Sequence, residues 1–225
     1  MIVVLIAGKP LAMPWVKENA DALLVQWYAG EQQGCTLADI LLGKVNPSGK
    51  LNVSFPRSTG NTPCFYNHFV TDREEPFDQP GTPEEPKGHY IFDKPEPLWN
   101  FGHGKSYTTF DYVDCALSDT LLAASDTLKV SVMIKNTGRC DGKEVVQLYV
   151  RDKVSTVATP IQQLKAFQKE LVPVGYTREV KLVLPIAELA LYNADMEEVI
   201  EPGEFELQIG SASDDIRIRR TIIVR

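Results

Sequence analysis

Acidic side chains are the most numerous groups in this sequence that could do chemistry. The chain has 30 Asp and Glu among 225 residues, and several are adjacent pairs: Glu74-Glu75, Glu84-Glu85 and Glu197-Glu198. General acid–base catalysis needs a carboxyl group with a raised pKa, which requires a buried or closely paired site. Adjacent acids on proline-rich or turn segments are normally solvated, so these pairs predict no catalytic centre.

Three motif searches test the sequence for nucleotide or acyl chemistry. Residues 43–50 resemble a phosphate-binding loop, but five residues instead of four separate the two glycines, and Leu51 stands where Ser or Thr is required. Residues 102–107 begin like a dinucleotide-binding loop, but Tyr107 occupies the position of the third glycine. The sequence contains no G-x-S-x-G nucleophile elbow. We therefore predict neither activity.

Cysteine and histidine are candidate metal ligands or redox groups. Four cysteines and three histidines occur without a C-x-x-C pair and without zinc-ligand spacing: Cys35, Cys64, Cys115, Cys140, His68, His89 and His103. We predict no metal site and no cofactor. An even number of cysteines permits two disulfides, but the spacing favours isolated thiols in small packed sites. The redox compartment stays open.

The charge balance and hydropathy exclude two classes of partner. The chain has 23 basic against 30 acidic residues, a net charge of −7, and lacks the cationic face that displaces counterions from nucleic acid. Its longest apolar run, residues 2–7, is too short to cross a bilayer. No basic stretch precedes that run, as a secretory signal would require. We expect no nucleic-acid partner and no membrane partner.

The first half of the sequence has the pattern of an α/β layer. Residues 2–6 are continuously apolar, which predicts a strand buried on both faces of a parallel sheet, and residues 22–28 predict a second strand. A helix is expected over residues 31–42, ended by Gly43. Residues 51–55 read as extended, and a turn-rich excursion follows over residues 57–99.

The second half has the pattern of an all-β sandwich. Its apolar residues alternate with polar ones in seven short segments, at about 110–117, 128–135, 145–150, 164–171, 179–184, 204–209 and 216–224. Seven such strands in about 110 residues predict an immunoglobulin-like sandwich. Because there is no Cys…Trp…Cys arrangement, the fibronectin type III-like form is favoured. We expect an α/β domain over residues 1–113 and a sandwich over residues 114–225.

Several stretches also resemble, in order, the motifs of glycoside hydrolase family 3. Trp27-Tyr28-Ala29-Gly30-Glu31 is similar to the family's WYPGE segment, and Phe101-Gly102-His103-Gly104 with Ser106-Tyr107-Thr108 is similar to its FGxGLSYT junction. Further matches lie at residues 37–43, 46–58, 142–150 and 201–205. Two departures are Ala29 in place of proline and Lys105 in place of leucine. The resemblance covers essentially the whole chain.

The resemblance implies the C-terminal portion of a β-glucosidase-like enzyme. Larger members of the family combine a TIM barrel that carries an Asp nucleophile, an α/β sandwich that carries a Glu acid/base, and a fibronectin-like domain. No residue here matches the nucleophile or the acid/base. The sequence therefore assigns no catalytic residue, leaves the substrate-binding residues unknown, and predicts that this chain alone is inactive.

The implied partners follow from the same resemblance. A full-length enzyme would bind a β-linked oligosaccharide or glycoside and hydrolyse its terminal sugar with retention, and it would be secreted or periplasmic. The missing N-terminal TIM barrel would pack on this chain. Without it, exposed strand edges predict self-association. The alternative is a stand-alone carbohydrate-binding or protein-interaction module.

The matched residues have structural explanations as well. Glycines 30, 34, 43 and 49 are expected to serve backbone geometry. Trp27, Tyr28, Phe101 and Tyr107 are expected to be packing residues. A weaker reading gives residues 66–68, Tyr-Asn-His, a place in the wall of a substrate pocket.

Overall fold

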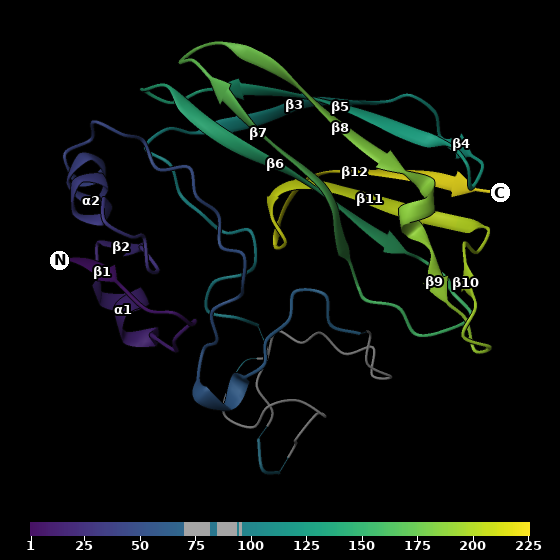
Figure 1. Ribbon diagram of the computed structural model, residues 1–225, viewed down its shortest axis with the longest axis horizontal. Coiled ribbons are helices and arrows are strands. Elements are labelled where there is room, and N and C mark those ends of the chain that lie inside the picture. The colour runs from purple at the N-terminus through teal and green to yellow at the C-terminus, as the bar shows by residue number, and fades with distance from the viewer. Residues whose placement is uncertain (70–81, 85–93, 95) are drawn as a thin grey trace. The chain divides into compact units, whose positions relative to one another are not determined.

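The computed structural model describes residues 1–69, 82–84, 94 and 96–225 (Figure 1). The chain forms two compact units. The first unit consists of residues 1–46 and 51–66 with the described residues from 82 to 103. The second consists of residues 47–50, 67–69 and 104–225.

The first unit contains a short parallel α/β motif. Strands β1 (Ile2–Leu5) and β2 (Ala22–Val25) pair in parallel, with Ile2 opposite Ala22. Helix α1 (Pro14–Asn19) connects them, and helix α2 (Gln33–Leu41) follows. Gly43 has φ +72° after α2, so the expected left-handed stop is confirmed. The fold is therefore α/β in this unit, as the apolar runs predict.

Several local expectations differ from the structure. Helix α1 was not predicted, because six residues are too few to show a helical period. Its first residue is a proline, whose fixed φ suits a helix start. Strand β2 ends at Val25, before the predicted residue 28. Residues 51–55 form no strand, and Phe55 makes only an isolated bridge to Trp99.

Burial in the first unit is low. No residue from 1 to 53 is buried, and neither helix has a buried residue. The expectation of a strand over residues 2–6 is confirmed for Ile2–Leu5, but its burial on both faces is not, since Ile2 is 58% exposed. Neither described helix is long and apolar enough to cross a membrane.

The second unit is a two-sheet sandwich, and all seven predicted strands are present in it. They are β3 (Phe110–Leu117), β5 (Thr127–Asn136), β6 (Gly142–Asp152), β7 (Gln163–Val172), β8 (Thr177–Pro185), β11 (Gly203–Ala212) and β12 (Asp215–Val224). One sheet has the order β4-β12-β11-β6-β7, in which the short β4 (Leu121–Leu122) pairs in parallel with β12, and the other has the order β3-β5-β8. This arrangement of antiparallel strands in two sheets is that of immunoglobulin-like folds.

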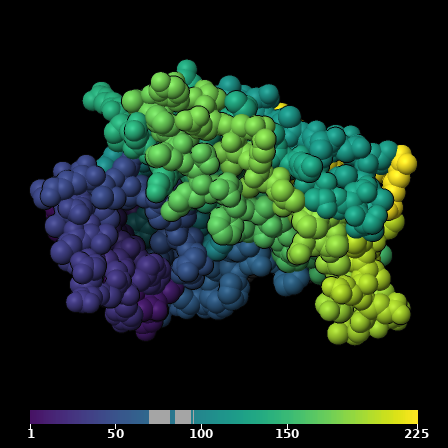
Figure 2. Space-filling model, turned by 45° about the horizontal axis from the view of Figure 1, so that its top comes forward, coloured from purple at the N-terminus to yellow at the C-terminus, as the bar shows by residue number. Residues whose placement is uncertain are grey.

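Three two-residue strands were not foreseen: β4 (Leu121–Leu122), β9 (Leu191–Tyr192) and β10 (Glu198–Val199). Strands β9 and β10 form a hairpin that protrudes from the sandwich (Figures 1 and 2). Asn193 organises it, because its Oδ1 accepts hydrogen bonds from the backbone N–H groups of Asp195 and Glu197. A strand of two residues is too short for an alternation of apolar and polar residues to be recognised in the sequence.

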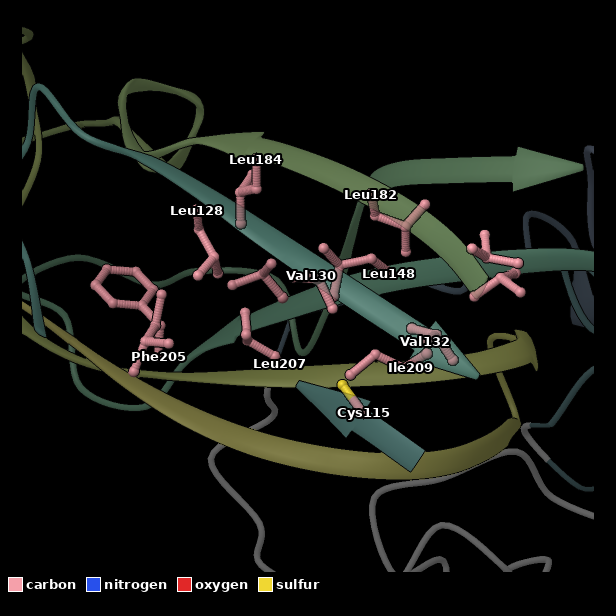
Figure 3. Packing of buried hydrophobic residues seen from close by; sticks show 14 of the residues in the cluster. Cys115, Leu128, Val130, Val132, Leu148, Leu182, Leu184, Phe205, Leu207 and Ile209 are labelled. Carbon is pink, nitrogen blue, oxygen red and sulfur yellow. The ribbon is translucent and has the colours of Figure 1, made fainter. Parts of the chain in front are cut away.

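The core of the sandwich lies between its two sheets. Leu128, Val130, Val132 and Ile134 point inward from β5 and are at most 1% exposed. Figure 3 shows Leu128, Val130 and Val132 facing Leu207 and Ile209 of β11. The alternation in the sequence therefore reports the buried face correctly. Strand β6 has buried side chains on both of its faces from Glu144 to Val150, which alternation alone does not predict.

Candidate functional site

The loops after β1 and β2 meet at the carboxyl edge of the parallel strands. Ligands of open α/β sheets bind at this edge, because the connecting loops converge there. A Cβ added to Gly8 would lie 2.7 Å from Cε2 of Tyr28, so the tyrosine ring rests against the Gly8 backbone. Tyr28 is nevertheless 76% exposed. A glycine-backed, solvent-facing aromatic ring offers an apolar face on which the C–H face of a sugar or another aromatic ring can pack.

Trp27 holds the loop after β2 in an uncommon conformation. Its φ of +51° lies in the left-handed region, which is costly for a bulky residue and persists only where surrounding contacts enforce it. The indole ring lies 5.9 Å from the ring of Phe55, which is fully buried. The preceding Gln26 donates its Nε2–H to the carbonyl oxygen of Gln33. These contacts position Tyr28 next to Gly8.

An aromatic cluster in the first unit supports this loop. Phe55 packs edge-on against Trp99, with the ring centroids 6.0 Å apart. The Lys17 ammonium lies 5.7 Å from the centre of the Trp99 ring and donates to the carbonyl oxygen of Leu98 at 2.7 Å. A cation over an indole face is attracted by the ring quadrupole. Helix α1, which the sequence did not reveal, supplies this cation.

The structure confirms the expected packing for some of the residues named in the sequence analysis and contradicts it for others. Trp27 and Phe101 pack against aromatic rings, as expected, with Phe101 stacked on Tyr66 at 4.2 Å. The packing expectation is wrong for Tyr28 and for Tyr107, which is 50% exposed. The carbonyl oxygen of His68 accepts a hydrogen bond from the Ile161 N–H in the second unit. The excursion over residues 57–99 is described only in part, and Glu74-Glu75, Glu85 and His89 lie outside the described residues.

Apart from Cys64, which lies in the first unit, the described groups with perturbed pKa values lie in the sandwich. Burial raises the pKa of the Cys64 and Cys115 thiols and of the Asp152 carboxyl. All four cysteines are free, and only Cys115 is buried, while Cys35 is exposed.

Among the described residues, no three His, Cys, Asp or Glu side chains gather closely enough to hold a metal ion. Residues 151–155 and 157–161 line a cavity of about 340 Å³.

The fold and the loop edge define a class: a parallel α/β part followed by a fibronectin type III-like sandwich. Residues 1–107 match the family model of the glycosyl hydrolase family 3 C-terminal domain. Residues 144–213 match that of the fibronectin type III-like domain. The chain belongs to glycoside hydrolase family 3 and corresponds to the C-terminal portion of its members.

Relatives place this portion within longer proteins. The chain is 40% identical over 219 residues to a β-xylosidase of Formosa agariphila, covering 96% of this chain and 29% of that protein. It is 37% identical to a periplasmic β-glucosidase of Salmonella typhimurium, covering 28% of it. A β-glucosidase from Listeria innocua in complex with isofagomine superposes with a TM-score of 0.88 and 36% identity, over 99% of this chain and 31% of that one. The chain thus spans less than a third of these relatives.

Proposed function

We propose that this chain is the C-terminal part of a β-glycosidase that hydrolyses terminal β-linked sugars with retention. Relatives named as β-glucosidases and a β-xylosidase support the substrate class. The nucleophile and the acid/base would come from the part of the enzyme that this chain does not include.

The low burial of residues 1–53 carries this proposal. A two-stranded sheet is marginal by itself in water, and parallel sheets normally have both faces covered. Here β1 and β2 have half-buried side chains, and Ile2, Ile6 and Trp15 are 58%, 51% and 62% exposed. We propose that further strands and helices, together with an N-terminal TIM barrel, cover these side chains in the full enzyme.

The carboxyl edge of β1 and β2 is the part of this chain that we expect to approach the substrate. Tyr28 would offer its exposed ring face to a sugar, while the strained Trp27 backbone and Gly8 hold that ring in place. A residue that only stacks on substrate binds the ground state and the transition state alike, so its loss raises KM more than it lowers kcat.

A chimeric enzyme tests the proposal. The matching C-terminal 31% of the Listeria innocua β-glucosidase would be replaced by this chain, and hydrolysis of an aryl β-glucoside measured. We expect the chimera to be active and this chain alone to be inactive. In the chimera, Tyr28→Ala should raise KM about tenfold, whereas Tyr192→Ala, which removes another exposed tyrosine, on β9, should leave KM unchanged. A folded but inactive chimera would contradict the proposal.

The uncovered surface also predicts that the isolated chain self-associates. Sedimentation over a hundredfold range of concentration, roughly 1 to 100 μM, should show a rising average mass. A strictly monomeric sample with a sharp, concentration-independent melting transition would contradict this expectation. Calorimetry with cello- and xylo-oligosaccharides tests the alternative of a stand-alone binding module, and binding by the chain alone would favour that alternative.

A further inference from the structure

A buried ion pair joins two distant parts of the sequence within the second unit. The Lys50 Nζ lies 3.2 Å from Glu144 Oε1, and the two side chains are only 14% and 7% exposed. The same ammonium donates to the carbonyl oxygen of Gly104 at 3.1 Å. Lys50 is the last residue of the segment 47–50, whose chain neighbours on both sides belong to the first unit. The sandwich therefore holds this short segment by its charged end.

Glu144 depends on Lys50 for its charge balance. Its Oε1 is buried, and the Lys50 ammonium is the cation that lies 3.2 Å from it. The groups that face it from β3 and β12 are the buried hydroxyl of Tyr112 and the Asp215–Arg217 pair. Arg217 is already engaged, because its Nε and Nη2 donate to the two carboxylate oxygens of Asp215. Without Lys50, the buried Glu144 carboxylate would have no cation of its own, because Asp215 already holds Arg217.

Close backbone contact completes the binding of the segment. A Cβ added to Gly104 would lie 2.3 Å from the carbonyl oxygen of Gly49, so only glycine lets the two backbones approach this closely. On β7, Lys169 donates from its Nζ to Ser48 Oγ at 3.3 Å. Three consecutive residues of the segment, 48, 49 and 50, thus each have a partner on the sandwich.

We propose that Glu144 and the Gly104 carbonyl form a lysine socket, an interaction surface of the sandwich whose occupant is the segment 47–50 of the same chain. The ammonium of Lys50 is the recognised group. A buried ion pair adds little net stability, since desolvation of both charges offsets their attraction, but an unpaired buried charge is strongly unfavourable. The socket therefore selects where the segment binds, with a minor effect on how stable the sandwich is.

Tryptic cleavage of the full chain tests the socket directly, because trypsin must take the lysine side chain into its own pocket. The Lys50–Leu51 bond is the reporter, and the bond after Lys44, whose side chain is 67% exposed, is the internal reference. In the native chain we expect cleavage after Lys44 to be much faster. Glu144→Gln should speed cleavage after Lys50 at least about tenfold relative to Lys44.

Two further variants make the result specific. Glu204→Gln removes the carboxylate of the exposed Lys153–Glu204 pair, so it is the matched control and should leave the ratio unchanged. Gly104→Ala should release Lys50 as Glu144→Gln does while leaving every charge in place, and it decides the matter if Glu144→Gln unfolds the sandwich. Native cleavage after Lys50 as fast as after Lys44, or an unchanged ratio in both Glu144→Gln and Gly104→Ala, would overturn the proposal.

Discussion

The Thr108 hydroxyl donates a hydrogen bond to Oδ1 of Asn136 at 2.6 Å, and this is one of four hydrogen bonds that the Asn136 side chain makes. Its Oδ1 also accepts from the Gly138 N–H, and its Nδ2 donates to the carbonyl oxygens of Cys140 and Val172. Asn136 is fully buried at the end of β5. One side chain thus substitutes for water at four polar groups that the sandwich closes over.

Replacing Asn136 should therefore be costly. Asn136→Ala leaves those four groups without their partner, and we expect a loss of about 3 kcal/mol in the free energy of unfolding. Urea unfolding followed by circular dichroism measures it. The neighbouring Lys135→Ala, on the exposed face of β5, should change the value by less than about 0.5 kcal/mol. Equal effects of the two substitutions would refute this account.

Two glycines of β11 should differ sharply in their tolerance of alanine. A Cβ at Gly210 would lie 2.1 Å from the backbone oxygen of Asp215, which cannot move without disturbing β12. At Gly203 the nearest atom is 3.9 Å away. We expect Gly210→Ala to cost more than about 2 kcal/mol and Gly203→Ala less than about 0.5 kcal/mol, measured by thermal unfolding. A tolerant Gly210 would mean that the two strands can separate at their bulge.

Glu144 should make a small, pH-dependent contribution to the stability of the sandwich. Burial raises the pKa of Glu144 above its usual value near 4.5, although Lys50 and Arg217 oppose the shift. A raised carboxyl pKa means that folding favours the protonated form, so this contribution is complete below the unfolded pKa and is lost as pH rises through the folded pKa. Tyr112 and Asp215 also face this group, but burial raises the pKa of Tyr112 and Arg217 holds that of Asp215 low.

Comparison of the native chain with the Glu144→Gln variant isolates the pH-dependent contribution of Glu144 to stability. Near pH 4 the two proteins should have similar unfolding midpoints in urea, because Gln resembles the protonated acid. As the pH is raised to about 7, the midpoint of the native chain should fall relative to that of the variant. Glu204→Gln serves as the exposed control. A relative rise of the native midpoint toward neutral pH would show that attraction to Lys50 outweighs desolvation.

The tip of the β9–β10 hairpin offers a position where substitution can stabilise the protein. Met196 has φ +61° and is 77% exposed, so it carries the strain of the left-handed conformation with little packing in return. Asn adopts this conformation readily and β-branched residues do not. Met196→Asn should be neutral or stabilising, and Met196→Val should be less stable than it by at least about 1 kcal/mol, measured by thermal unfolding. Equal stabilities would show that the hairpin tip relaxes.

The sequence predicted the regular part of the fold well and the isolated contacts poorly. Alternating apolar residues predicted β5, because the period of a strand is present in the residues themselves. Helix α1 and hairpin strands β9 and β10 went unrecognised because they are too short to show a period. Tyr28 was expected to pack and is exposed, since residue type gives hydrophobicity but does not say which neighbours are present.

By itself, the sequence determined the class of each half, the seven long strands of the sandwich, and the motif order that links the chain to its family. These follow from local periodicity and from residues adjacent along the chain. Only the tertiary structure decided that Gly8 lies under Tyr28 and that Lys50 pairs with Glu144. Both contacts join residues from separate segments, and the choice of partner depends on backbone approach and on desolvation, which become defined only when the segments are brought together.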